Sequence, residues 1–255
     1  MKYYCLADVH GFYQETIDAL TNAGYFSDNG KKKIIICGDI LDRGQEANEM
    51  VDFVLDLMAK DQVILIKGNH EDLFLDLVDN LNYWLQKGIV NTHHFSNRTF
   101  HTLLDLSGMD FDEVFLNPNE CKKRIKQHPF YKTIIPSMID FYETSHYVFV
   151  HGYIPCDEED VYKYDPLWRK ANSDKWYRAR WINGMKANHD GVKVEGKVVV
   201  CGHYHASFGH FNYHHEGSEF GSDAIFTPFY DDGIIAIDGC TAFSHIVNCV
   251  VLEDF

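Results

Sequence analysis

Seven side chains of the metal-ligand type stand just after five short apolar runs in this chain of 255 residues. The runs are rich in β-branched and aromatic residues and give way abruptly to glycine, carboxylate, amide or imidazole groups, a pattern typical of buried strands that end at a ligand site. The seven residues are Asp8, His10, Asp39, Asn69, His151, His203 and His205. Ligand sites of α/β sheets gather at the carboxyl edge of the strands, so we expect all seven to converge on one point.

The donor set consists of two carboxylates, one amide and four imidazoles. Seven ligands are too many for one tetrahedral zinc ion, which takes four, but they suit two divalent ions that share a bridging carboxylate. Mixed nitrogen and oxygen ligation favours manganese, iron or zinc over magnesium or calcium, and manganese is our first choice. Two such ions roughly 3.5–4 Å apart are arranged for displacement at phosphorus. The pattern therefore predicts a dinuclear centre for phosphoester chemistry.

Each segment also has a purely structural explanation. An Asp-x-His pair is a weak signal by itself, and a single histidine such as His151 often only completes hydrogen bonds in a core. The segments around Asp39 and Asn69 are more specific. All five segments in this order, each at the end of a strand pattern, favour the metal site.

Two of these segments carry a family pattern. Residues 38–44 read G-D-x-x-D-R-G and residues 68–71 read G-N-H-E. With them the chain resembles the calcineurin-like metallophosphoesterases, in particular bacterial and phage members of the serine/threonine phosphoprotein phosphatase branch; residues 234–240 are also similar to that branch. The resemblance implies an α/β fold with four layers, α/β/β/α, in which two sheets pack face to face with helices outside, and a single domain over residues 1–255.

The resemblance divides the seven ligands between two ions, with Asp39 shared by both. It places Asp8, His10 and His205 at the first ion, and Asn69, His151 and His203 at the second.

The resemblance also implies roles around the substrate. Arg43 would bind phosphate oxygens through its guanidinium group, which is permanently charged and can donate two hydrogen bonds at once. Asn69 would also take part in binding the substrate phosphate. His70 would protonate the leaving group, and Asp42 would keep His70 protonated and oriented. Arg169 is a further candidate for phosphate binding, because related phosphatases place an arginine near this position.

Arg169 also has a structural explanation. It would then be a surface arginine that packs on Trp168 or Trp176, and Arg178 or Arg180 would be the alternative clamps.

The chain departs from the branch at two points. The Gly-His-x-His motif of residues 202–205 keeps a second histidine that protein phosphatases usually lack, which admits diester or nucleotide substrates. Residues 88–94 replace the Asn-Gly-Gly segment of many bacterial relatives, so that substrate contacts there do not carry over.

The composition of the chain limits the kinds of molecule that it can bind and indicates where it is located. The chain has 23 basic and 38 acidic residues, a formal net charge of −15, which argues against tight binding to nucleic acid or anionic membranes. Seven cysteines without a C-x-x-C pair are typical of reduced thiols in a cytoplasmic protein, and we find no leader pattern or 18-residue apolar run. A phosphorylated protein or a small phosphoester is the expected partner.

Helical patterns alternate with the strand runs in the first part of the chain. Apolar residues recur at helical spacing over residues 13–21, 45–59 and 72–86, which predicts the βαβ units of a layered α/β fold.

The later part is less regular. Residues 89–145 are polar and aromatic, with helical patterns at 100–106 and 118–127, and we interpret them as a helical cap inserted beside the site; a packing element without substrate contact is the alternative. Residues 206–232 predict a long loop or hairpin, and residues 234–236 and 247–252 predict two more strands.

The remaining histidines include adjacent pairs at 93–94 and 214–215. Side chains of adjacent residues point in different directions on a helix or strand, so we expect these pairs to make polar contacts rather than to bind metal.

The leading expectation is thus a metal-dependent phosphomonoesterase, in particular a serine/threonine protein phosphatase. The first alternative is a nucleotide hydrolase or phosphodiesterase, such as a symmetric dinucleoside tetraphosphatase. A metal-binding module without turnover is less favoured, because both His70 and Asp42 are present.

Overall fold

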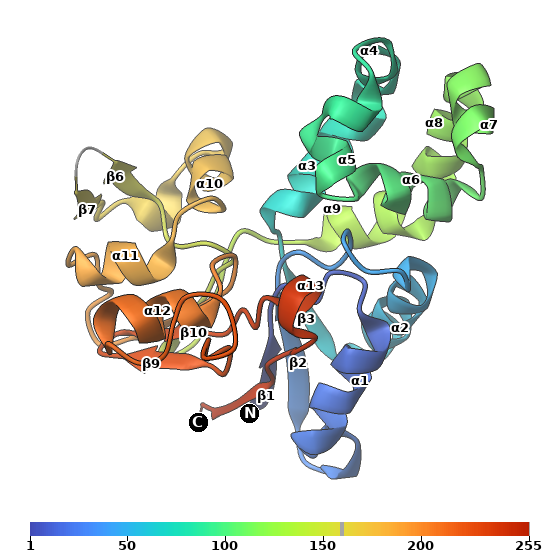
Figure 1. Ribbon diagram of the computed structural model, residues 1–255. Coiled ribbons are helices and arrows are strands. Elements are labelled where there is room, and N and C mark those ends of the chain that lie inside the picture. The colour runs from blue at the N-terminus through green and yellow to red at the C-terminus, as the bar shows by residue number, and fades with distance from the viewer. Residues whose placement is uncertain (159–160, 255) are drawn as a thin grey trace.

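Two β-sheets packed face to face form the centre of the computed structural model, which describes residues 1–158 and 161–254 (Figure 1). The first sheet has the strand order β11-β1-β2-β3, and the second has the order β4-β5-β8-β10-β9. In the first sheet β1, β2 and β3 are parallel, and in the second β5, β8 and β10 are parallel. The parallel strands of both sheets bring their carboxyl ends toward the site described below.

The strands are short. Those of the first sheet are β1 (Lys2–Leu6), β2 (Lys32–Cys37), β3 (Val63–Ile66) and β11 (Val250–Glu253). Those of the second are β4 (Tyr142–Glu143), β5 (Tyr147–Phe149), β8 (Val198–Cys201), β9 (Phe229–Asp231) and β10 (Ile234–Ala236). A separate hairpin pairs β6 (Cys156–Glu158) with β7 (Tyr162–Tyr164).

Alternate residues of each strand supply two different cores. Tyr3, Cys5 and Ile35 point into the layer between the sheets, where Phe149 and Val200 of the second sheet meet them. Their neighbours along β1 and β2 are buried on the opposite face under helices. Burial on both faces explains why these strands are continuous apolar runs instead of alternating patterns.

Helices cover the outer face of each sheet, which confirms the predicted four-layer α/β/β/α arrangement (Figure 1). On the first sheet these are α1 (Tyr13–Asn22), α2 (Ala47–Ala59) and α3 (Asn69–Asp79), which begins just after β3; α4 (Leu81–Gln86) continues from α3 and lies away from the sheet (Figure 1). On the second they are α10 (Ser173–Ala179), α11 (Gly184–His189) and α12 (Ala206–Tyr213). Shorter elements are η1 (Tyr25–Ser27), η4 (Trp168–Lys170) and α13 (Thr241–Ser244).

One predicted helix differs in its limits. The pattern over residues 72–86 is divided into α3 and α4 at Asn80, and α3 already begins at Asn69. The Glu71 carboxylate accepts a hydrogen bond from the Gly68 amide (2.7 Å) and so closes the first turn around Asn69 and His70. Two predicted site residues therefore stand on a helix N-terminus and not on a loop.

The segment predicted as a cap is mostly helical. It contains η2 (Ile89–Asn91), α5 (His93–Ser96), α6 (Thr99–Ser107), α7 (Phe111–Leu116), α8 (Pro118–Gln127), η3 (Phe130–Ile134) and α9 (Ile135–Ser137). These helices rise beside α3 and α4 at one end of the sandwich (Figure 1). Leu103 and Phe130 share a core with Val54 and Phe74 of the first helical layer, and on this ground we propose that the chain is one domain. The last residues of the predicted range instead form β4.

The prediction of a loop or hairpin over residues 206–232 was wrong at its start, where α12 forms. Gly209 lies inside that helix at a position that has no room for a side chain. A Cβ there would lie 2.5 Å from the Met185 sulfur and 2.7 Å from the Phe229 ring. Close packing of α12 on its neighbours thus outweighs the low helix propensity of glycine. No helix among the described residues is long and apolar enough to cross a membrane.

Candidate metal centre

A small pocket of about 90 Å³ lies at the carboxyl ends of the parallel strands. Eight of its lining residues follow strands or begin the next helix, and two come from elsewhere. The lining residues are Asp8, His10, Asp39, Arg43, Asn69, His70, Asn97, Trp181, His203 and Asp238. Five of the seven predicted ligands therefore line the pocket. A sixth, His151, is in contact with one of them, because its Nε2 lies 2.7 Å from Asn69 Oδ1.

The backbone of the site is held in an unusual conformation. Among the described residues, eleven that are not glycine have a positive φ, and six of these belong to the site. The six are Asp8, His10, Asp39, Asp42, Arg43 and His203. Left-handed backbone is unfavourable for side chains with a Cβ, and it concentrates where the surrounding fold over-determines a functional geometry. Each strand therefore turns sharply after its last residue and directs its ligand inward.

Two motif glycines make room for carboxylates. A Cβ on Gly68 would collide with the Asp39 carboxylate, and a Cβ on Gly202 would collide with that of Asp8. Glycine at these positions lets each carboxylate lie against a neighbouring strand's backbone. The glycines of the G-N-H-E and G-H-x-H motifs thus have a steric role at the site.

Asp39 is the central carboxylate. Together with His10 and His70 it forms one cluster of potential ligands, and together with His151 and His203 it forms a second. Within each cluster the ligand atoms lie within 4.8 Å of one another. An aspartate shared by two clusters has the position that a carboxylate bridging two ions requires.

The histidines are oriented by backbone carbonyls. His10 Nδ1 donates to the Leu41 carbonyl (3.0 Å) and His151 Nδ1 donates to the Cys37 carbonyl (2.8 Å). A carbonyl can only accept, so in each neutral ring the proton is on Nδ1 and the Nε2 lone pair faces the cluster. This arrangement is the usual second shell of a metal-binding imidazole.

The surroundings of His151 fit a cation. Its Nε2 lies 2.7 Å from Asn69 Oδ1 and 3.4 Å from Asp39 Oδ1. Burial lowers the pKa of His151, so the ring is neutral near pH 7 and three electron-pair donors face one another. A positive ion among them would satisfy all three, and the donor set therefore fits the metal that the sequence predicts.

Several ionisable groups of the pocket have pKa values far from their ordinary ones. Burial raises the pKa of Asp8 well above its usual range, and Asp238 and Asp39 add to that effect. Burial also acts to raise the pKa of Asp39, but His151, His70 and His10 outweigh it and hold that pKa below its usual range. For His203, burial lowers the pKa to about 3. A neutral His203 beside an ionised Asp39 has the protonation states that metal binding needs.

The predicted acid and its partner are in contact. His70 Nδ1 lies 2.7 Å from Asp42 Oδ2, and His70 Nε2 lies 3.3 Å from an Arg43 nitrogen on the pocket side. Burial acts to lower the pKa of His70, yet Asp39 and Asp42 more than offset it, so that the pKa lies above its usual value. The raised pKa increases the fraction of His70 that carries a second ring proton at a given pH.

Helix α6 fixes Asp42 from the other side. The hydroxyls of Thr99 and Thr102 each donate to an Asp42 oxygen at 2.7 Å, and Asn97 just before this helix lines the pocket. The segment at 89–145 therefore contacts Asp42 and contributes Asn97 to the pocket wall, and its role as a cap over substrate stays a prediction.

Glu71 is a positioning residue that the sequence did not reveal. It is buried, and its carboxylate accepts hydrogen bonds from the amides of Gly68 (2.7 Å), Ile40 (2.9 Å) and Asp39 (3.2 Å). Burial raises the pKa of Glu71 to about 7. It ties the turn after β2 to the turn after β3.

Asp238, Asn97 and Trp181 line the pocket but were not predicted as site residues. Asp238 follows the apolar run of β10 just as Asp8 follows β1, so the same sequence rule could have found it. Burial raises the pKa of Asp238 to about 6. Asn97 and Trp181 carry no comparable signal, because they reach the pocket from a helical linker and from the turn after α10.

His205 is not brought into the pocket. Its Nδ1 lies 2.8 Å from the Ser207 hydroxyl, and its Nε2 lies 3.5 Å from Glu219 Oε1. The chain enters α12 immediately after His205, and the ring lies 4.6 Å, centroid to centroid, from that of Phe220. The helix start directs this side chain toward the 207–220 segment and away from His203.

Arg169 is also placed elsewhere. It donates two hydrogen bonds to Glu143, at 2.8 Å and 2.6 Å, and its guanidinium carbon lies 4.2 Å from the Trp168 ring centroid. This geometry is the surface packing on Trp168 considered as the alternative. Arg180, one of the fallback candidates, is buried and pairs with Asp72 and Asp140.

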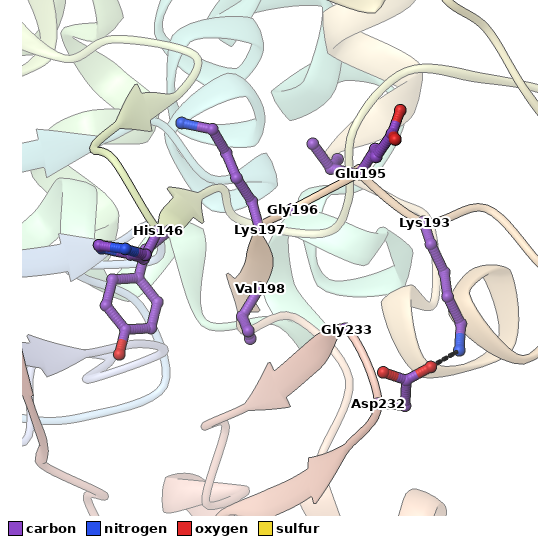
Figure 2. Close-up of a pocket in the computed structure, with 10 residues that line it drawn as sticks. His146, Lys193, Glu195, Gly196, Lys197, Val198, Asp232 and Gly233 are labelled. Carbon is purple, nitrogen blue, oxygen red and sulfur yellow. Dashed lines mark hydrogen bonds and ion pairs between the residues drawn. The ribbon is translucent and has the colours of Figure 1, made fainter.

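A larger hollow of about 520 Å³ lies at the opposite, amino end of β5, β8 and β10. Figure 2 shows Lys193 turned toward Asp232, with an ion pair of 2.6 Å between them. Lys197 on the same wall is paired with Glu143 at 3.0 Å. This hollow holds no cluster of catalytic groups, and the chemistry therefore belongs to the small pocket.

Comparison with known proteins gives the family. The profile of the calcineurin-like phosphoesterases matches residues 1–237. Two curated relatives are the asymmetrical bis(5'-nucleosyl)-tetraphosphatases PrpE of Bacillus mycoides (35% identical over 77 residues, 28% of this chain and 31% of that protein) and of Bacillus velezensis (29% over 120 residues, 45% of each). The chain thus matches less than half the length of these relatives.

A solved structure described as a cold-active protein tyrosine phosphatase superposes with a TM-score of 0.55 at 18% identity, covering 99% of this chain and 73% of the other, and so shares the fold. With the profile matching nearly its whole length, the chain belongs to the calcineurin-like phosphoesterase family.

Proposed function

We propose that the chain is a metal-dependent phosphoric monoester hydrolase with two divalent transition-metal ions, manganese being the first choice. In this proposal Asp8 and His10 hold one ion and Asp39 is shared by both. The ligands of the second ion are Asn69, His151 and His203. His205, which the family resemblance places at the first ion, would have to leave Ser207 and Glu219 to reach it. The cytoplasm is the proposed location, since the seven cysteines include no C-x-x-C pair and four of them, Cys5, Cys37, Cys121 and Cys201, are buried in the core.

The chain's own residues divide the work around these ions. When bound, the ions would supply Lewis acidity and a nucleophilic water at neutral pH. Arg43 reaches the pocket with a guanidinium that can grip two phosphate oxygens. His70 presents Nε2 on the same side and can pass its proton to the leaving oxygen. Asp42, held by Thr99 and Thr102, keeps His70 in that orientation.

The His70–Asp42 pair beside Arg43 carries the proposal. An alkoxide leaving group is a strong base and needs a proton as the P–O bond breaks, whereas a polyphosphate leaving group does not. A buried imidazole whose pKa is raised above its usual value suits the first case. This supports alkyl phosphomonoesters as substrates, including the phosphoserine and phosphothreonine of proteins. The net charge of −15 gives no support to nucleic acid as a substrate.

Monoesters are expected to be cleaved faster than diesters. An aryl phosphate and a phosphoserine peptide should exceed a bis-aryl phosphate in kcat/KM by about tenfold or more, because the extra phosphate oxygen meets Arg43. Arg43→Ala should lower kcat/KM for monoesters by about 10–200-fold, the factor that corresponds to the loss of about 1.5–3 kcal/mol from a charged hydrogen bond.

Arg169→Ala is the matched control, since it also removes one guanidinium. It should leave kcat/KM within about twofold, because Arg169 is half-exposed and bound to Glu143 outside the pocket. Equal losses in the two variants, or a preference for the bis-aryl diester, would overturn the monoester proposal.

Hydrolysis of a dinucleoside tetraphosphate is the second candidate. The curated relatives carry that activity in their names, as the asymmetrical reaction; the example considered from the sequence was the symmetric one. Trp181 adds an observation from this chain: it lines the pocket, is 44% exposed, and its ring lies 5.8 Å from His203. An exposed aromatic face beside a phosphate site can stack a nucleobase.

Diadenosine tetraphosphate tests this candidate. Asymmetrical cleavage yields ATP and AMP, and symmetric cleavage yields two ADP, which chromatography separates. Trp181→Ala should lower kcat/KM for the tetraphosphate by about tenfold, since base stacking contributes about 1–3 kcal/mol, but should barely affect an aryl monoester. A tetraphosphate turned over more slowly than any monoester, with no effect of Trp181→Ala, would count against it.

A further inference from the structure

A second cluster of histidine and carboxylate groups lies outside the pocket, at the end of α12. It consists of His210 in the last turn of the helix, His214 one turn later, and Glu216 in the segment that follows. Their ligand atoms lie within 4.8 Å of one another. The Glu216 amide donates to the His210 carbonyl (2.9 Å) and so folds the chain back over the helix end.

His210 has one ring nitrogen without a partner. Its Nε2 lies 3.1 Å from the Thr227 carbonyl, which can only accept, so Nε2 carries the proton. In the neutral ring Nδ1 is then a lone pair, and this atom is buried without any hydrogen-bond partner. It lies 3.5 Å from Glu216 Oε2. A buried acceptor facing a carboxylate is unfavourable unless a metal ion or a second ring proton lies between them.

The neighbouring groups complete the geometry. His210 is nine-tenths buried and stands beside β9, where its ring lies 5.5 Å from that of Phe229 (Figure 1 shows α12 and β9 side by side). The exposed His214 ring lies 5.7 Å from that of His210 and also packs on Phe229. The Thr227 carbonyl holds His210 as a second-shell acceptor holds a metal-bound imidazole.

We propose that His210, His214 and Glu216 bind a single zinc ion, a third metal site separate from the pocket. Two imidazoles and one carboxylate suit a borderline ion such as Zn²⁺, with a fourth position open to water on the exposed side of His214. The ion would tie the last turn of α12 to the segment that follows it, and the hydrogen bond from His210 Nε2 to the Thr227 carbonyl would orient the ring. The sequence expectation that positions 214–215 do not bind metal is thereby revised for His214 alone.

The other histidine pair lacks this arrangement. His93 and His94 lie close, with ring centroids 4.0 Å apart, although adjacent side chains were expected to diverge. His94 Nε2 lies 3.1 Å from Asp76 Oδ2, which also accepts from the Trp84 indole (2.9 Å). Metal on that nitrogen would leave the buried His94 Nδ1 as a proton donor without an acceptor. This cluster is better explained as a hydrogen-bonded packing contact.

The test measures the number of zinc ions bound per chain in the manganese-loaded protein. Wild type, His214→Ala, Glu216→Gln and His215→Ala are equilibrated with zinc chloride in the presence of a chromophoric chelator, and bound zinc is measured by mass spectrometry. His215→Ala is the matched control, because it removes the adjacent exposed histidine outside the cluster. Any exchange of zinc into the pocket is common to all four proteins and cancels in the comparison.

Wild type and His215→Ala should each hold one more zinc per chain than the two cluster variants, in which zinc affinity falls at least tenfold. Zinc-edge anomalous diffraction should place a peak between His210 Nδ1 and Glu216. Equal zinc content and affinity in all four proteins would overturn the proposal and indicate a protonated His210 paired with Glu216. Glu216→Gln keeps the shape of the side chain and decides the question if His214→Ala is unstable. Activity is not a readout, so failure of this site leaves the proposed function untouched.

Discussion

Asp39→Asn is expected to reduce bound transition metal from about two equivalents per chain to less than one and to lower kcat by about 10³-fold or more. Asp39 belongs to both ligand clusters, so neutralising it weakens both ions at once. The expected loss of kcat corresponds to the several kcal/mol by which metal ions stabilise the transition state of phosphoryl transfer. Metal content by mass spectrometry and turnover of an aryl phosphate measure the two effects on the same sample.

The substitution is chosen to preserve shape. Asp39 Oδ1 accepts a hydrogen bond from the His70 amide (3.0 Å), and the amide oxygen of asparagine can still do so. Asp165→Asn serves as the control, because Asp165 is also buried and charged but pairs with Lys175 away from the pocket. Full activity in a chelator-treated, metal-free wild type would refute the dinuclear mechanism outright.

His70→Asn is expected to retain both ions while lowering kcat for an alkyl phosphate by about 10²–10⁴-fold, the usual contribution of a positioned acid. The reason is geometric: His70 contacts Asp42 through Nδ1 and faces Arg43 and the pocket through Nε2. The loss should shrink for aryl phosphates, whose leaving groups need little protonation. Turnover of a matched alkyl and aryl pair, with metal content measured in parallel, checks the prediction.

Asp42→Asn gives a graded comparison. It keeps His70 but removes the negative charge that helps to raise the His70 pKa. We therefore expect kcat to fall more for the alkyl phosphate than for the aryl phosphate, as in His70→Asn, but by a smaller factor. His70 also belongs to one of the potential ligand clusters. If His70→Asn loses metal, or loses alkyl and aryl activity equally, His70 is a ligand and not the acid.

Much of the fold was predictable from periodicity. The apolar runs at residues 34–37 and 198–201 are buried on both faces, which is why they are unbroken, and the helical patterns at 13–21 and 45–59 became α1 and α2. Residues 206–213 were missed because histidine, glycine and aromatic residues lack a helical apolar stripe. Packing of Gly209 against Met185 and Phe229, and not local propensity, makes that segment a helix.

The site was predictable wherever a ligand follows its strand directly. Asp8 and Asp39 are placed by the local turn after β1 and β2, so the order of residues determines where they point. The sequence left two explanations open where a side chain chooses among distant partners. Arg169 pairs with Glu143, 26 residues earlier.

The sequence by itself thus determined the main strands and the convergence of strand-end ligands, because apolar runs and the turn after each strand are local properties. The sandwich of two sheets was expected from the resemblance of the motifs to a family. Only the tertiary structure decided that Asn97 and Trp181 join the pocket, that His205 turns toward Glu219, and that His210 keeps an unpartnered nitrogen beside Glu216. Each of these outcomes depends on which segments pack together, and the identity of a single residue does not encode that choice.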